Sequence, residues 1–197
     1  MRTMRGNWVV LSVLLVGAAW VNVSGGERSY PYGKGLDKWK AQSRPLSQEF
    51  PKVQEGSFRA SVRPEYFIDM QQVKKMKDMD NVVLLDARPE KFYQGKGPWS
   101  KPGHIPGAVN LPWRSLMADD NPTLLKPEGQ SQQLLKQRGV SPDRTIIVSC
   151  GTGREATNEF LLLKWYLGYP NVKLYEGSFT EWTAYPDNPT VTGENPQ

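Results

Sequence analysis

From about residue 58 onward, short apolar runs alternate with amphipathic segments. The runs Val82–Asp86 (VVLLD) and Thr145–Ser149 (TIIVS) are apolar almost throughout. Continuous runs of this length predict strands that are buried on both faces, as in a parallel sheet. Weaker runs predict further strands at residues 58–62, 107–111 and 172–175.

Amphipathic segments between these runs predict helices. Asp69 can cap a helix that extends to about residue 78. In residues 156–167, Phe160, Leu163 and Leu167 fall on one stripe, and Gly168 ends the segment. Further helices are predicted at residues 129–138 and 178–183. This alternation predicts an α/β fold, in which a central, mostly parallel sheet carries helices on both faces.

The first 26 residues have the order of a secretory signal peptide. Arg2 and Arg5 precede an apolar stretch, residues 8–21, and small residues follow at positions 24–26. The apolar stretch is short for a membrane-spanning helix, which needs about 20 residues. We therefore expect export to the periplasm or another extracytoplasmic compartment. The alternative is an uncleaved N-terminal anchor, the one case in which the chain would contact a membrane.

The composition of the remaining residues indicates segment boundaries and limits the classes of binding partner. Residues 27–57 are rich in Gly, Pro, Ser and charge, and predict a linker or a strap on the domain. Residues 58–190 predict one domain, followed by a tail at 191–197. The net charge of +5 comes without a dense basic run, which argues against nucleic acid as a partner. A mildly positive surface suits small anions.

Cys150 is the only cysteine, so no internal disulfide can form. It directly follows the TIIVS run, and the next five residues make a turn into a helix. Two glycines allow several backbone N–H groups to converge there. The spacing of Thr152 and Glu155 is that of a capping box, and Arg154 adds a positive charge. The pattern predicts a nucleophilic thiol whose pKa is lowered by the loop and the helix terminus.

Four motifs occur in an order that resembles one known family. They are the Cys-Gly-Thr-Gly loop at residues 150–153, Asp86-Ala87-Arg88, GHIPGAVN at 103–110, and YEGSFTEW at 175–182. Over about residues 58–190 the chain resembles the rhodanese-like sulfurtransferases. Its loop is similar to that of thiosulfate and 3-mercaptopyruvate sulfurtransferases.

This resemblance implies an enzyme of the thiosulfate sulfurtransferase type, with a persulfide on Cys150. The donor would be a small anion, thiosulfate or 3-mercaptopyruvate, and the acceptor a thiol, cyanide or a protein cysteine. No metal and no organic cofactor is implied. The substrate-binding residues would be those of the loop: Gly151, Thr152, Gly153, Arg154 and Glu155.

Departures from the family pattern leave the donor open. Arg154 is the only basic loop residue, and Phe92, with Lys91 beside it, stands where two-domain relatives carry a substrate-binding arginine. The sole histidine, His104, is expected to make structural hydrogen bonds. The residues that would line the pocket or brace the loop are Asp86, Arg88, Lys91 and Trp113, with Trp99 in a nearby loop.

Two other functions are compatible with this fold. A phosphatase or arsenate reductase needs a Cys-x5-Arg loop, but the position of that arginine is occupied by Ala156. A sulfur relay or binding module that does not turn over would keep the same Cys150 loop. Turnover with free donor separates an enzyme from such a carrier.

Overall fold

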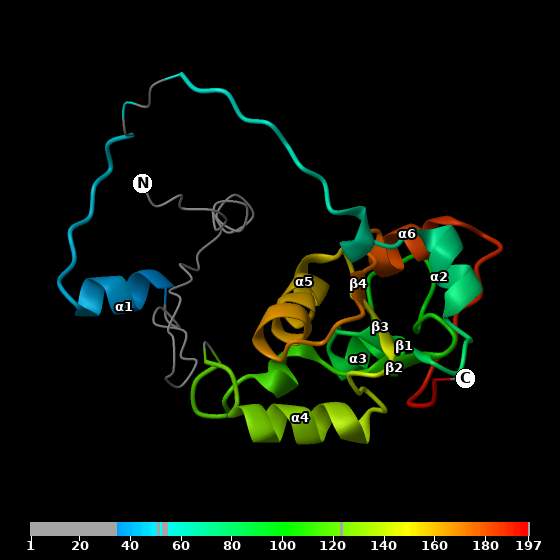
Figure 1. Ribbon diagram of the computed structural model, residues 1–197. Coiled ribbons are helices and arrows are strands. Elements are labelled where there is room, and N and C mark those ends of the chain that lie inside the picture. The colour runs from blue at the N-terminus through cyan, green and yellow to red at the C-terminus, as the bar shows by residue number, and fades with distance from the viewer. Residues whose placement is uncertain (1–34, 51, 53–54, 123, 197) are drawn as a thin grey trace.

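Four parallel strands form the centre of the protein (Figure 1). The computed structural model describes residues 35–50, 52, 55–122 and 124–196, so the predicted leader, residues 1–26, lies outside the described residues. The sheet order is β2-β1-β3-β4, and every neighbouring pair is parallel. The strands are β1 (Val82–Asp86), β2 (Ala108–Asn110), β3 (Thr145–Ser149) and β4 (Val172–Leu174). These confirm the predicted strands at the same places.

The predicted strand at residues 58–62 is wrong. Phe58 and Val62 are 79% and 76% exposed, and the segment pairs with no strand of the sheet. Without a partner its apolar side chains have nothing to be buried against. Among the described residues, the first to join the sheet is Phe67, which forms an isolated parallel bridge with Leu174 of β4.

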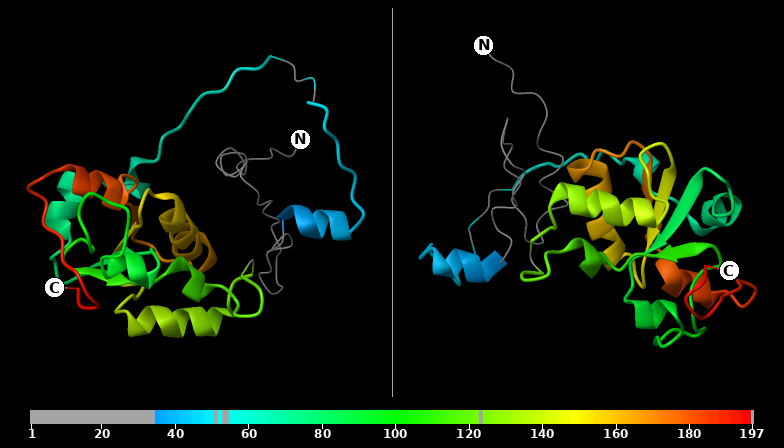
Figure 2. Two further views of the ribbon diagram at one scale, coloured as in Figure 1. Left: turned by 180° about the vertical axis from the view of Figure 1, so that it is seen from behind. Right: turned by 90° about the horizontal axis from the view of Figure 1, so that it is seen from below.

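Helices cover both faces of the sheet, as the alternating pattern predicts (Figure 2). Successive side chains of β1 enter opposite faces: Val83 and Leu85 join one core cluster, Val82 and Leu84 the other. The first cluster also takes side chains from α4 (Glu128–Gln137) and α5 (Arg154–Leu161). The second takes side chains from α2 (Met70–Met76), α3 (Glu90–Tyr93) and α6 (Ser178–Ala184).

The start of α2 confirms Asp69 as its cap. The Asp69 carboxylate accepts the backbone N–H of Gln72 at 2.8 Å, and the Gln72 side chain accepts the N–H of Asp69 at 3.1 Å. This reciprocal capping box satisfies two N–H groups that the first helical turn leaves free.

The helix predicted at residues 156–167 is divided. α5 ends at Leu161 and continues as a π-helical turn, Leu162–Tyr166, in which the N–H of Leu167 donates to the carbonyl of Leu162 at 2.9 Å. Adjacent Leu162 and Leu163 are both buried in this wider turn. Gly168, with φ +73°, ends the segment in the left-handed conformation that glycine favours.

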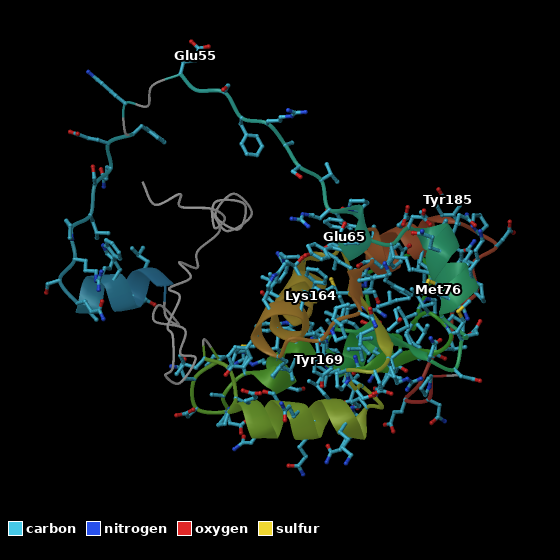
Figure 3. All side chains as sticks on the ribbon, viewed as in Figure 1. Glu55, Glu65, Met76, Lys164, Tyr169 and Tyr185 are labelled. Atoms are coloured by element: carbon cyan, nitrogen blue, oxygen red, sulfur yellow. The ribbon has the colours of Figure 1, made fainter. Side chains whose placement is uncertain are left out.

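Residues before the domain make few contacts with it. A short helix, α1 (Gly35–Ala41), precedes a segment in which every described residue from 41 to 65 is exposed. Around Glu55 this segment runs apart from the sheet and its helices (Figure 3). The described residues of this segment are therefore not buried against the domain. None of the helices in the described part of the chain is long and apolar enough to span a bilayer.

Candidate functional site

Cys150 lies at the carboxyl edge of the sheet, directly after β3. The adjacent pair in the register, Asp86 and Ser149, places it beside the end of β1. Ligands of parallel sheets bind outside this edge. Cys150 itself has no exposed surface and belongs to the apolar cluster that contains Val148 and Ala156. The thiol is therefore held at the edge where chemistry is expected, but underneath a cover of side chains.

The loop after Cys150 directs backbone amides at the sulfur. The N–H groups of Thr152 and Ala156 both hydrogen-bond the thiol, and each works to lower its pKa. Gly153 makes the turn possible, because its φ is +84° and a Cβ there would lie 2.7 Å from the carbonyl oxygen of Glu176. The predicted amide cradle thus exists, and the backbone conformation at Gly153 requires glycine.

The predicted capping box in this loop is wrong. The N-cap of α5 is Gly153, which has no side chain to make a cap hydrogen bond. Thr152 therefore lies one residue before the cap, and Glu155 is the second residue of the helix. A box would need the cap residue and the third helical residue, and the left-handed glycine shifts the helix start out of that register.

The prediction of a lowered thiol pKa is also contradicted. Burial raises the pKa of Cys150, and the neighbouring Glu155 carboxylate raises it further. The amides of Thr152 and Ala156 oppose this without overcoming it. The sequence pattern indicated the amides correctly, but it could not show that the sulfur is fully buried beside a carboxylate. Burial and the Glu155 carboxylate thus both favour the protonated form of Cys150.

Glu155 connects the thiol to Arg154. Its carboxylate forms an ion pair with the Arg154 guanidinium at 3.0 Å. Burial works to raise the pKa of Glu155, but hydrogen bonds from Cys150 and Arg154 bring it below its usual value. The Arg154 side chain is 85% exposed. The guanidinium is therefore accessible from solvent.

The loop is fastened from the other side by the start of α6. The amide of Cys150 donates to the Ser178 hydroxyl at 3.0 Å, and that hydroxyl donates to the carbonyl of Tyr175 at 2.8 Å. Ser178 adopts a φ of +53°, a conformation that is uncommon outside glycine. Sequence reasoning did not single out Ser178 or Thr180, although both belong to the YEGSFTEW motif.

Asp86 and Arg88 form a buried ion pair beside this edge. The Arg88 Nε donates to the Asp86 carboxylate at 2.9 Å, and its Nη2 donates to the carbonyl of Gly103 at 2.9 Å. The pair ties the end of β1 to the loop that carries His104. Both ring nitrogens of His104 face backbone carbonyls, of Tyr93 and Asn195, so its contacts are structural.

The remaining predicted residues, Trp113 and Lys91, differ in burial. Trp113 is partly buried and packs against the cluster that includes Cys150. Lys91 is exposed, with its Nζ 4.9 Å from the Phe92 ring. Phe92 in turn contacts Trp99, the ring that covers Gly151.

One buried carboxyl was not found from the sequence. Glu159 is 1% exposed, one helical turn after Glu155 on α5, and neither of its oxygens has a hydrogen-bond partner. Burial raises its pKa well above the usual value, and the charge of Asp86 raises it further. Its sequence position resembles that of an ordinary exposed helical glutamate, so periodicity alone gives no signal.

Comparison with known proteins places this geometry in a family. Residues 69–185 match the model of the rhodanese-like domain. Over 161 residues the chain is 35% identical to the 3-mercaptopyruvate sulfurtransferase of Escherichia coli strain K12, covering 80% of this chain and 56% of that protein. It is 34% identical over 170 residues to the thiosulfate sulfurtransferase of Azotobacter vinelandii, covering 86% of this chain and 62% of that protein.

Two further similarities support different conclusions, one about the family and one about the fold alone. A sulfur carrier protein of Thermus thermophilus is 31% identical over 174 residues, 81% of this chain and 60% of that protein. The solved anaerobic ergothioneine biosynthesis enzyme of Chlorobium limicola superposes with a TM-score of 0.72 at 24% identity, over 82% of this chain and 40% of that chain, and this likeness shows the fold alone. The chain spans about half to three-fifths of the length of the curated relatives it matches. On the strength of the domain match and these relatives, it belongs to the rhodanese-like domain family.

Proposed function

We propose that this protein is a sulfurtransferase that carries sulfane sulfur on Cys150. The donor is a small anion, thiosulfate or 3-mercaptopyruvate, and the acceptor is a thiol or cyanide. The observation that carries the proposal is the position of Cys150 at the end of β3, where the amides of Thr152 and Ala156 are directed at its sulfur. Such a cradle stabilises negative charge on sulfur, first as thiolate and then as persulfide.

In the first half-reaction the thiol loses its proton to the Glu155 carboxylate, to which it is already hydrogen-bonded. Because the pKa of Glu155 lies below its usual value, the carboxyl group passes this proton on to solvent. The Cys150 thiolate then attacks the outer sulfur of thiosulfate. A sulfur–sulfur bond forms to Cys150, the bond to sulfite breaks, and sulfite leaves with the electron pair.

In the second half-reaction an acceptor thiolate attacks the outer sulfur of the persulfide. The bond between that sulfur and Cys150 breaks, and Cys150 keeps the electron pair. A proton from solvent returns to the regenerated thiolate, which closes the cycle. No other covalent group is required.

The entrance to the site favours an anionic donor. Arg154 is the exposed cation of the loop, and arginine holds an oxyanion through two parallel hydrogen bonds. Because Cys150 is fully buried, donor entry requires a side chain over the thiol to move. An anion that binds Arg154 would compete with Glu155 for the guanidinium and so loosen the pair that lies next to the thiol.

A phosphatase-type reaction is not supported by the loop. Position 156, where such enzymes need an arginine, is a fully buried alanine that contributes its amide to the sulfur. A carrier without turnover remains the second candidate, favoured by the similarity to the Thermus thermophilus sulfur carrier. Carrier and enzyme share the persulfide and differ in whether free donor is consumed catalytically.

The test uses the full chain with thiosulfate and with 3-mercaptopyruvate, with intact mass measured before and after an acceptor is added. We expect a gain of one sulfur atom on Cys150 and its loss to cyanide or a thiol. Cys150→Ser is the matched control and should gain no sulfur. Many turnovers per chain identify an enzyme, and a single stoichiometric transfer identifies a carrier. No persulfide with either donor would overturn the proposal.

A further inference from the structure

The carbonyl groups of the loop are anchored to α6. The backbone N–H of Phe179 donates to the Cys150 carbonyl at 3.0 Å, and the N–H of Thr180 donates to the Gly151 carbonyl at 3.0 Å. The Thr180 hydroxyl adds a second bond to the same Gly151 oxygen at 2.7 Å. The two amides are among the N–H groups that the first turn of a helix leaves unpaired. α6 thus holds two consecutive peptide groups of the loop.

Anchoring the Gly151 carbonyl also orients the next amide. In a trans peptide the C=O and the following N–H point in opposite directions. With its oxygen held by Thr180, the peptide between Gly151 and Thr152 directs its N–H away from α6. That N–H is one of the two that hydrogen-bond the Cys150 sulfur.

Trp99 fixes the direction of the Thr180 hydroxyl. Its indole N–H donates to the Thr180 oxygen at 2.9 Å. A hydroxyl has one hydrogen to donate, and because Trp99 occupies an acceptor position, that hydrogen is left to point at Gly151. The chain of bonds therefore has one direction, from Trp99 through Thr180 to the Gly151 carbonyl.

The Trp99 ring is itself held tightly. The rings of Phe92 and Phe179 meet it edge-on at centroid distances of 5.7 and 5.5 Å, and the Arg88 guanidinium lies 4.7 Å from its centroid. On the loop side a Cβ at Gly151 would lie 2.5 Å from a ring carbon. The ring thus lies directly on the peptide whose carbonyl it helps to fix.

We propose that Trp99 and Thr180 are positioning residues that hold the Thr152 amide on the Cys150 sulfur and so control how readily that sulfur carries negative charge. The inference rests on the proposed function in that the charged sulfur is the thiolate and then the persulfide of Cys150. Neither side chain needs to touch a substrate. Their effect passes through the orientation of a single peptide group.

The test compares Thr180→Val, which keeps the shape and removes the hydroxyl, with Thr180→Ser, which keeps the hydroxyl. Trp99→Phe removes the indole N–H and serves as a second, independent variant. The matched control is Thr183→Val on the same helix, since the Thr183 hydroxyl donates to the carbonyls of Phe179 at 2.9 Å and Thr180 at 3.4 Å and not to the loop. The measurement is the rate of Cys150 alkylation by iodoacetamide against pH, with the melting temperature of each variant.

We expect the alkylation midpoint to rise in Thr180→Val and in Trp99→Phe and to return in Thr180→Ser. Persulfide formation at neutral pH should fall about fivefold, which corresponds to the net value of one ordinary hydrogen bond. Thr183→Val should lower the melting temperature without moving the midpoint.

Unchanged midpoints in Thr180→Val and Trp99→Phe would overturn the inference, as would Thr180→Ser behaving like Thr180→Val. If Thr180→Val does not fold, Trp99→Phe decides alone. Alkylation needs no sulfur donor, so a failure of the positioning role can be distinguished from a failure of the proposed sulfurtransferase function. A shifted midpoint without any persulfide would remove the proposed function and leave the positioning role standing.

Discussion

The carboxylate of Glu155 is hydrogen-bonded to the thiol of Cys150, five residues earlier in the chain. This contact works against the amides of the loop, because the carboxylate disfavours the thiolate that the amides favour. Burial and the carboxylate together raise the pKa of the thiol, and in the proposed reaction the same carboxylate is the first acceptor for its proton.

Glu155→Gln should lower the pKa of the Cys150 thiol. The substitution removes a negative charge while keeping the shape, and so leaves the amides of Thr152 and Ala156 as the main influence besides burial. The midpoint of iodoacetamide alkylation should shift to lower pH. The pH dependence of persulfide formation should shift with it, because glutamine resembles the protonated carboxyl. A midpoint that stays in place or rises would show that Glu155 does not contact the thiol in solution.

Arg154→Ala should impair use of the donor far more than it affects folding. The guanidinium is almost fully exposed, and its ion pair with Glu155 is a surface pair, which contributes little to stability. A hydrogen bond from arginine to an anionic donor is worth more, so kcat/KM for the donor should fall about tenfold. Arg154→Lys should recover part of the loss because it restores the charge without the planar fork.

A lower melting temperature with unchanged donor kinetics would instead assign Arg154 to the scaffold. Both quantities are measured on the same alanine variant. The acceptor step offers an internal comparison, since transfer from preformed persulfide to cyanide does not need the oxyanion grip and should change less than the donor step.

The fold was largely predictable from the sequence because its strands are buried on both faces. Continuous apolar runs such as Val82–Asp86 and Thr145–Ser149 leave few alternatives. The segment at 58–62 shows the limit of the same reasoning. Its apolar content resembles an edge strand, but whether a partner strand lies beside it depends on long-range pairing that no local pattern encodes.

The sequence predicted the conformation of the loop, but not the burial and the charged neighbour of the Cys150 thiol. The glycines at 151 and 153 and the following helix indicated converging amides, and the structure has them. The sign of the thiol pKa shift depends on burial and on a side chain that turns back onto the sulfur. Both are tertiary properties, so the local pattern gave the wrong direction. The left-handed Gly153 likewise moved the helix start and abolished the expected capping box.

Asp86→Ala should destabilise the domain strongly. The variant leaves the Arg88 guanidinium, whose side chain is 2% exposed, without its counter-charge. Removing one partner of a buried ion pair costs about 3–5 kcal/mol of the free energy of unfolding. Urea denaturation monitored by fluorescence measures this loss.

The double variant Asp86→Leu/Arg88→Met is the control for the charge itself. It removes both charges and fills the space with apolar groups, and such replacements recover much of the lost stability. A double variant as unstable as Asp86→Ala would mean that the loss arises from packing or from the bond to Gly103, and not from an unpaired cation.

Glu159→Gln should stabilise the protein at neutral pH and leave it unchanged in acid. Burial, and then the charge of Asp86, raise the pKa of Glu159 well above its usual 4.5. As the pH rises above 4.5, the unfolded chain releases this proton while the folded chain retains it, so the folded state binds more protons. Stability then falls with rising pH until the folded pKa is reached. Glutamine does not titrate, so the variant escapes that loss. The difference in free energy of unfolding between variant and parent should be near zero below about pH 4 and should grow steadily toward neutral pH.

Urea denaturation at a series of pH values measures the difference. A constant difference across the series would mean that Glu159 has the same pKa in both states, and a parent that gains on the variant with rising pH would mean that its carboxylate is stabilised by a partner in the fold.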